Sequence, residues 1–279
     1  MDRLYALLSV LVLAALIAGG YYWSQRRPAE ESQTAAPASP APALEKEQSA
    51  APPPEPAIQH PIEAPQSDAA LPASVDADSY IKSALIGLLG KKGVASFLRV
   101  DGFVRRAVAT VDNLARPHAA SRLWPVNQTP GRFAVVASGK DIVVNSDNAL
   151  RYAPFVVFVE SVDTGRAVAL YTRLYPLFQK AYEQLGYRGQ YFNDRLVSVI
   201  DQLLETPDPA GPLKVELTEV KGSVTPLQPW VRYRLSDPAL EALSAGQKIL
   251  LRTGPVNERR LKAKLLDIRR HLVREKPSG

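Results

Sequence analysis

Residues 28–76 form a stretch that a compact fold cannot use for its core. Eleven of these residues are Pro and 13 are Ala, and eight acidic side chains stand against the single Lys46. A segment so poor in large apolar side chains buries too little surface to offset the entropy of ordering it. We therefore predict a disordered, acidic, Pro/Ala-rich linker. Residues 77–274 remain as the one span that can form a globular domain, and 275–279 are a tail.

An uncharged apolar run precedes the linker. Residues 4–23 (LYALLSVLVLAALIAGGYYW) contain no Asp, Glu, Lys or Arg. As a helix, such a run spans roughly 30 Å, which is the thickness of the hydrocarbon core of a bilayer. Tyr21, Tyr22 and Trp23 close the run, and aromatic residues are typical of a membrane interface. We predict a transmembrane anchor within residues 1–27, and a cleaved signal peptide is the alternative.

Charge separates the domain from the linker. Residues 77–279 carry 30 Lys and Arg against 19 Asp and Glu, whereas the linker is acidic. A basic domain favours anionic partners. A long linker suits a domain that works at a distance from its membrane, so we expect a bacterial inner-membrane protein with its domain in the periplasm. Basic residues flank the apolar run on both sides, so orientation is not decided by charge. A cytoplasmic domain that binds nucleic acid is a less favoured alternative.

An apolar period of 3.6 residues dominates the domain and predicts a mainly α fold with a small antiparallel β portion. Tyr171, Tyr175, Phe178 and Tyr182 share one helical face and are expected in the core, and a seam of Leu261, Leu265, Ile268 and Leu272 should pack on the domain. Helices are expected from an Asp78 cap to Gly90, from about Asp101 to Leu114, at 147–161 after a Ser146 cap, and from Asp163 or Thr164 to near Leu185. Further helices are expected from an Asn193 cap to Leu204, at 238–243, at 247–252 and from about Val256. A hairpin is expected at 132–145, and paired strands are expected at 213–220 and 231–235.

Three short fragments resemble the motifs of serine acyltransferases. Ser79 and Lys82 fit S-x-x-K, Ser146 to Asn148 reads S-D-N, and Arg252-Thr253-Gly254 is close to K-T-G. The third fragment departs from the pattern, because Pro255 and a charged helix follow it where a paired strand is needed. Fragments this short also occur by chance. We therefore predict no enzyme, and an acyltransferase or hydrolase acting on peptidoglycan is the alternative.

Metal and cofactor chemistry has little support in the sequence. The chain has no Cys and three His. His60 falls in the linker, while His118 and His271 stand alone without the spacing that zinc sites use. The glycine-rich GLLGKKG at 87–93 follows a helix rather than a strand, so it is interpreted as a helix end instead of a phosphate loop. We predict no metal site and no cofactor.

Polar and aromatic residues at the ends of the predicted elements are the candidate binding residues. Arginine next to aromatic side chains suits the recognition of carboxylate, phosphate or sugar groups, because the guanidinium forks onto anions and stacks on rings. A structural role for Asn193, Asp194 and Arg195, as cap, helix-dipole partner and local ion pair, is the alternative. The candidates are Arg105, Arg106, Arg122, Trp124, Arg132, Arg151, Tyr152, Tyr191, Asn193, Asp194 and Arg195.

Three long stretches of the domain carry a resemblance to a known family. They are 104–126 (VRRAVATVDNLARPHAASRLWPV), 151–207 (beginning RYAPFVVFVESVDTGR) and 243–270 (LSAGQKILLRTGPVNERRLKAKLLDIRR). Together they resemble the proteobacterial family known only as domain of unknown function 3014, over nearly all of 78–273. The resemblance implies an inner-membrane-anchored envelope protein. It implies no activity, substrate or catalytic residue. The function predicted is a non-enzymatic binding or scaffolding module for an anionic envelope component or a partner protein.

Overall fold

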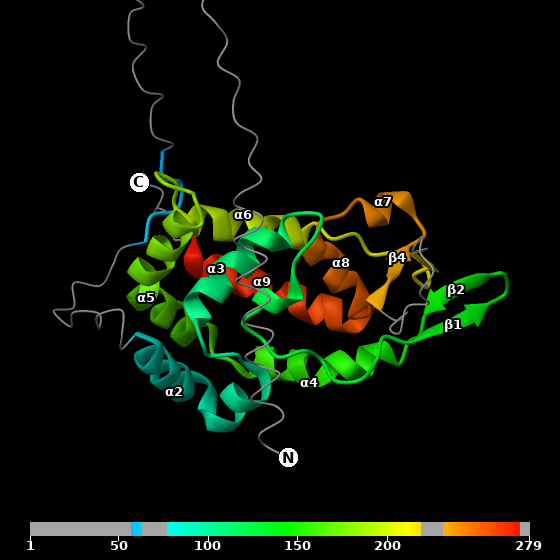
Figure 1. Ribbon diagram of the computed structural model, residues 1–279, viewed down its shortest axis with the longest axis horizontal. Helices are drawn as coiled ribbons and strands as arrows, with labels where there is room; N and C mark the ends of the chain where they lie inside the picture. The colour runs from blue at the N-terminus through cyan, green and yellow to red at the C-terminus, as the bar shows by residue number, and fades with distance from the viewer. Residues whose placement is uncertain (1–56, 63–76, 219–230, 274–279) are drawn as a thin grey trace, which may run out of the picture. The chain divides into compact units, whose positions relative to one another are not determined.

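The computed structural model describes residues 57–62, 77–218 and 231–273 (Figure 1). The predicted anchor at 4–23, most of the predicted linker and the tail lie outside these residues. Within the described ranges, no helix has both the length and the apolar character needed to cross a membrane. The described part is mainly helical and carries two small antiparallel sheets, as the sequence predicted.

The first two helices of the domain are α2 (Ala77–Phe97) and α3 (Phe103–Leu114). Gly90 interrupts α2 with a φ of 76°, which only glycine adopts readily, and the helix resumes beyond this kink. The predicted stop at Gly90 is therefore a kink rather than an end. Asp78, predicted as the cap, lies in the first turn of α2, where its carboxylate accepts a hydrogen bond from Gly102 N at 3.3 Å.

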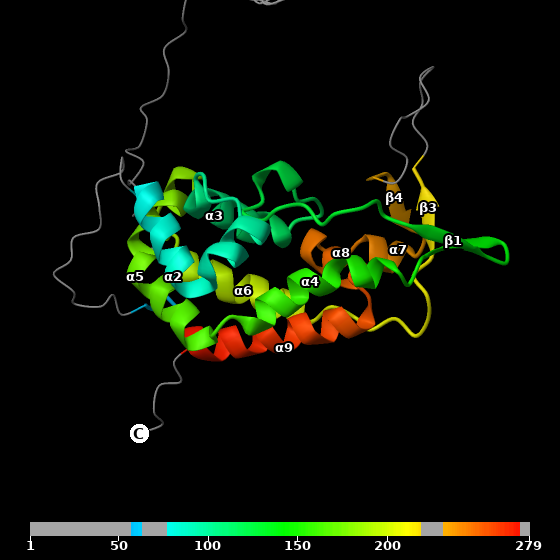
Figure 2. The same ribbon diagram turned by 90° about the horizontal axis from the view of Figure 1, so that it is seen from below.

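The β structure consists of two short hairpin-like pairs. β1 (Val135–Ser138) pairs antiparallel with β2 (Asp141–Val144), which confirms the predicted hairpin. β3 (Val215–Leu217) pairs antiparallel with β4 (Tyr233–Leu235), which confirms the second predicted pair. A single antiparallel bridge between Val143 and Lys214 joins the two sheets. Both ribbon views show β1 and β2 at the end of the described part away from α2 and α5 (Figures 1 and 2).

The central helices are α4 (Asn148–Ser161), α5 (Thr164–Gln184) and α6 (Phe192–Leu204), and a 3₁₀ turn, η1 (Ser121–Leu123), precedes the hairpin. Asp163 caps α5 as predicted, since its carboxylate accepts from Arg166 N at 2.7 Å. The predicted caps Ser146 and Asn193 are wrong. The N-cap of α4 is Asp147, whose own N–H is bonded by the Asn145 side chain, and the N-cap of α6 is Tyr191.

Three helices complete the chain: α7 (Pro238–Glu241), α8 (Ala245–Arg252) and α9 (Pro255–Leu272). Asp237 caps α7, and Ser244 with Gln247 forms a capping box on α8. Helix α9 packs against α4, α5, α6 and α8 and runs beneath them in Figure 2. Its predicted seam of leucines and Ile268 joins the apolar clusters of the core, which confirms that this stripe faces the domain.

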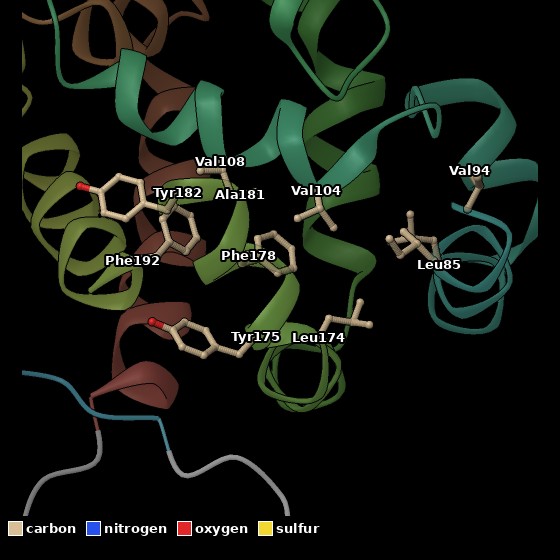
Figure 3. Packing of buried hydrophobic residues seen from close by; sticks show 11 residues of the cluster. Leu85, Val94, Val104, Val108, Leu174, Tyr175, Phe178, Ala181, Tyr182 and Phe192 are labelled. Carbon is tan, nitrogen blue, oxygen red and sulfur yellow. The ribbon is translucent and has the colours of Figure 1, made fainter. Parts of the chain in front are cut away.

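The largest apolar cluster lies between α2, α3, α5 and α6. Figure 3 shows Val108, Phe178, Tyr182 and Phe192 gathered between α3 and α5, with Leu85 and Val94 reaching in from α2. Val108 is 0% exposed, and Phe192 and Tyr182 are 1% and 2% exposed. The prediction that the aromatic face of α5 forms core is therefore confirmed. This cluster fixes the ends of α5 and α6 relative to α3.

Candidate functional site

The junction between α5 and α6 brings together five polar and aromatic side chains from two helices. The chain reverses direction here through Gly186 and Gly189, whose φ angles of 106° and 74° are closed to most other residues. Phe192 N at the start of α6 then donates to Gln179 Oε1 of α5 at 2.9 Å. We use the name docking surface for the set that results: Tyr171, Tyr175, Tyr191, Asn193 and Asp194.

Six residues of the predicted linker, 57–62 (AIQHPI), lie on the docking surface (Figure 1, blue). The Asp194 carboxylate accepts two main-chain hydrogen bonds, from Gln59 N at 3.0 Å and from His60 N at 2.7 Å. Tyr191 OH accepts a third from Ile62 N at 2.8 Å. Asn193 Nδ2 donates a fourth to the carbonyl of His60 at 2.9 Å. The segment is thus held through its main chain, and for these six residues the structure differs from an unstructured linker.

One side chain of the segment joins the core. Ile62 is half-buried and packs against the largest apolar cluster, next to Tyr191. Ile58, in contrast, is 54% exposed. His60 precedes a proline, which favours an extended main chain at that residue. The segment nevertheless combines a main chain that bends at Gln59 and His60 with a single apolar anchor, Ile62.

Asn193 is the buried centre of the docking surface. It is 0% exposed, although it carries a polar amide. Tyr171 OH donates to its Oδ1 at 3.2 Å, and its main-chain N–H donates to Tyr175 OH at 3.3 Å. These bonds orient the amide so that Nδ2 faces the His60 carbonyl. A buried donor left without a partner costs about 1–3 kcal/mol, so this surface requires an acceptor at that point.

Tyr171 and Tyr175 of the docking surface act as neutral hydrogen-bonding groups. Burial raises the pKa of Tyr171 well above its ordinary value. Burial also raises the pKa of Tyr175, and a hydrogen bond with Tyr191 raises it further. Neither hydroxyl can therefore lose its proton near neutral pH. The Tyr171 and Tyr175 hydroxyls are therefore available for hydrogen bonding.

Arg195 ties α6 to α3. Its guanidinium bonds Asp112, with Nη2 at 3.0 Å and Nε at 3.2 Å from Oδ1. Arg116 Nη2 lies 2.6 Å from the other carboxylate oxygen, and Tyr187 OH donates to that oxygen at 3.0 Å. Asp112 is only 5% exposed, and it raises the pKa of Arg116. The expected local ion pair of Arg195 is wrong, because its partner comes from a distant helix.

Asp112 escaped the sequence analysis, although a signal for it exists. It lies four residues after Val108 and eight after Val104, so it shares their apolar helical face. A charged residue in an apolar register is buried only when it is paired. That register predicts a charged partner for Asp112, and the structure provides two, Arg195 and Arg116.

The candidates around η1 hold the loop after α3. Arg106 donates through Nε to the Asp101 carbonyl at 2.9 Å and through Nη1 to the Arg122 carbonyl at 2.7 Å. Trp124 Nε1 is buried without a hydrogen-bond partner, and Arg105 is exposed on α3. The structure places these four residues in one region, away from the docking surface. Their role as a binding site stays a prediction.

The remaining candidates lie at the base of the β1–β2 hairpin. Arg151 donates to the carbonyls of Pro130 and Gly131 at 3.0 and 3.1 Å and to Asn148 Oδ1 at 3.0 Å. Its guanidinium also lies 5.5 Å from the ring centre of Tyr152. Arg132 is exposed in the segment that leads to β1. Because the donors of Arg151 are directed to protein oxygens, this residue supports the loop before the hairpin.

Two of the three acyltransferase-like fragments meet at a cavity of about 580 Å³. Ser146 and Asn148 line it together with Arg252 and Gly254, whereas Ser79 of α2 does not. The amide of Asn148 is already bonded to Ala134 N at 3.0 Å and to the Ala134 carbonyl at 2.6 Å. The proposed nucleophile is therefore absent from the cavity, and the Asn148 side chain serves the loop before β1. This arrangement does not favour the acyltransferase hypothesis.

Comparison with known proteins finds a match to one family model. The family model described as protein of unknown function (DUF3014) matches residues 103–269, which is more than half of the chain. No curated protein and no solved structure matches. Among the described residues, no group of three or more His, Cys, Asp and Glu side chains could hold a metal ion.

Proposed function

Because the chain belongs to the DUF3014 family of proteins of unknown function, whose description names no activity, we propose its function from the docking surface. The proposal is a non-enzymatic protein-interaction module that binds a short peptide segment at the α5–α6 junction. The single observation that carries it is the linker segment 57–62, held there by four main-chain hydrogen bonds.

The chemistry of the docking surface supports peptide binding over anion binding. Its charged group is the carboxylate of Asp194, which points at two consecutive main-chain N–H groups. Consecutive N–H groups form a concave donor pair that favours a negative charge, and here the protein supplies that charge. An anionic ligand would meet like charge at this position. The partner is therefore a polypeptide main chain rather than a phosphate or a nucleic acid.

The proposal includes the location of the module. The uncharged run at 4–23 supports a single anchor in a bacterial inner membrane, and the acidic linker supports a domain held apart from that membrane, on the periplasmic side. An interaction module with these properties can collect a partner protein of the cell envelope.

A peptide-binding assay with the full-length chain tests the function. The Ile62→Ser variant lacks the side chain that anchors residues 57–62 of the same chain, so the docking surface becomes accessible to an added peptide. A fluorescein-labelled peptide with the sequence of residues 55–65 is titrated against this variant, and its fluorescence anisotropy is measured. We expect saturable binding that weakens at least about tenfold when Asp194→Ala is added, because two hydrogen bonds to a charged group are lost.

Matched substitutions control the experiment. Asp147→Ala removes a carboxylate that makes no side-chain cap bond, and Tyr152→Phe removes a hydroxyl without a hydrogen bond in the described part of the chain. Neither change should alter the affinity, whereas Tyr191→Phe should lower it. Absence of peptide binding by the Ile62→Ser chain, with its helical content intact by circular dichroism, contradicts the proposed function.

A further inference from the structure

The docking surface uses every main-chain donor of the stretch from Gln59 to Ile62. Gln59 N and His60 N both bond Asp194, and Ile62 N bonds Tyr191. Pro61, between them, has no N–H to satisfy. An ordinary residue at that position adds a donor for which the contacts provide no acceptor. The docking surface therefore fits a segment in which two residues with a main-chain N–H precede a proline and one residue with a main-chain N–H follows it.

The side chains of the segment are used much less than its main chain. Gln59 is exposed, and neither its side chain nor that of His60 makes a hydrogen bond within the described residues. Ile62 alone packs against the apolar cluster under Tyr191. The surface thus leaves the first two side chains unspecified and selects an aliphatic residue after the proline.

From these contacts we infer that the partner of this module is a protein carrying a segment of the form any–any–proline–aliphatic whose main chain bends before the proline, and that residues 59–62 are an internal copy of that segment which competes for the same surface. The inference rests on the proposed function, because it names the ligand class of the same site. Recognition of this kind draws affinity from main-chain hydrogen bonds and specificity from a single side-chain contact.

Competition follows from the connection between the segment and the domain. Residues 63–76 join Ile62 to α2, so the internal copy is always near its own docking surface. A connection this short gives an effective concentration in the millimolar range. A free partner segment must therefore displace the internal copy, and its apparent affinity falls by the fraction of chains in which the surface is open.

Peptide variants test the ligand pattern on the full-length Ile62→Ser chain. The labelled peptide of residues 55–65 is prepared with a single N-methyl amide at the position of Gln59 or of His60, which removes the bonded N–H. We expect about a tenfold loss of affinity for each, and no loss for N-methylation at Ala57, which makes no hydrogen bond in the described contacts. Serine at the Ile62 position of the peptide should cost at least about tenfold, and alanine at Gln59 or His60 should cost nothing.

A second comparison tests the competition. The unmodified full-length chain should bind the same peptide at least about tenfold more weakly than the Ile62→Ser chain, while an Ile58→Ser chain should behave like the unmodified chain, because Ile58 is exposed. Equal affinities of the unmodified and Ile62→Ser chains overturn the competition although the proposed function stands. Insensitivity to N-methylation overturns the ligand pattern in the same way.

The unmodified chain and its Asp194→Ala variant also test whether a second copy of the chain occupies the docking surface. If residues 57–62 of a second copy filled the surface, the unmodified chain would self-associate with rising concentration, and Asp194→Ala would abolish the association. Sedimentation of the unmodified chain in detergent is therefore expected to show no such Asp194-dependent association. Its appearance overturns the inference of a separate partner.

Discussion

Asn193 shows how one residue can satisfy the local sequence pattern and yet serve a distant contact. Its position before an apolar helical run predicts an N-cap, but the N-cap of α6 is Tyr191, two residues earlier, and Asn193 lies within the helix. The Asn193 amide instead donates to the His60 carbonyl, 133 positions away in the chain. A cap can be predicted from neighbours in sequence, whereas an acceptor supplied by a remote segment cannot.

The buried tyrosines of the docking surface predict a resistance to alkaline ionisation. Burial raises the pKa of Tyr171 and Tyr175, so the folded chain keeps both protonated while an unfolded tyrosine ionises at about pH 10. Stability from these groups is therefore complete below about pH 10 and is lost as the pH rises further. Titration by tyrosinate absorbance should show both ionising only together with the loss of helical circular dichroism.

A Tyr171→Phe variant provides the check on this expectation. One tyrosinate fewer should appear in the cooperative alkaline step, while any absorbance change before that step stays the same. Loss of one tyrosinate from the change before that step instead shows that Tyr171 is accessible in the folded chain.

At the scale of elements, most of the fold could be predicted from helix periodicity and turn residues. The helices, the β1–β2 hairpin and the β3–β4 pair follow from apolar spacing, because each such element buries one face that its own residues define. Only part of the docking surface could be predicted from the sequence. Tyr191, Asn193 and Asp194 stood out as polar residues at a helix junction, but their ligand lies in the linker. Ile58 and Ile62 are the only isoleucines of residues 28–76, which is the one local sign of a docked segment there.

The kink of α2 allows a matched pair of glycine substitutions. Gly87 is helical and Gly90 has a φ of 76°, and a Cβ at either position meets no atom within 4 Å. Gly87→Ala should raise the free energy of unfolding by about 1 kcal/mol, because alanine loses less entropy in a helix. Gly90→Ala should lower it by about 1–2 kcal/mol, because alanine is strained at positive φ. Urea denaturation of both variants measures the difference; a gain of stability from Gly90→Ala contradicts the kink as an intrinsic feature of α2.

For the whole molecule, the proposed arrangement is an anchored chain with its domain outside the cytoplasm. The length and composition of 4–23 support it. Alkaline phosphatase fused after residue 76 should be active in cells, because this enzyme requires an oxidising compartment to form its disulfides. A reporter that is active only in the cytoplasm, fused at the same residue, should stay inactive. The reverse pair of results contradicts the periplasmic location.

Docking of 57–62 also sets the reach of the domain. If residues 4–23 form the proposed anchor, residues 28–56 alone separate it from the bound segment, and this length extends to at most roughly 100 Å. Once the segment is released, all of residues 28–76 become available and the contour length rises to roughly 170 Å. A partner that displaces the internal copy would thereby lengthen the linker between the anchor and the domain. Binding of the partner and extension of the linker would then be one event.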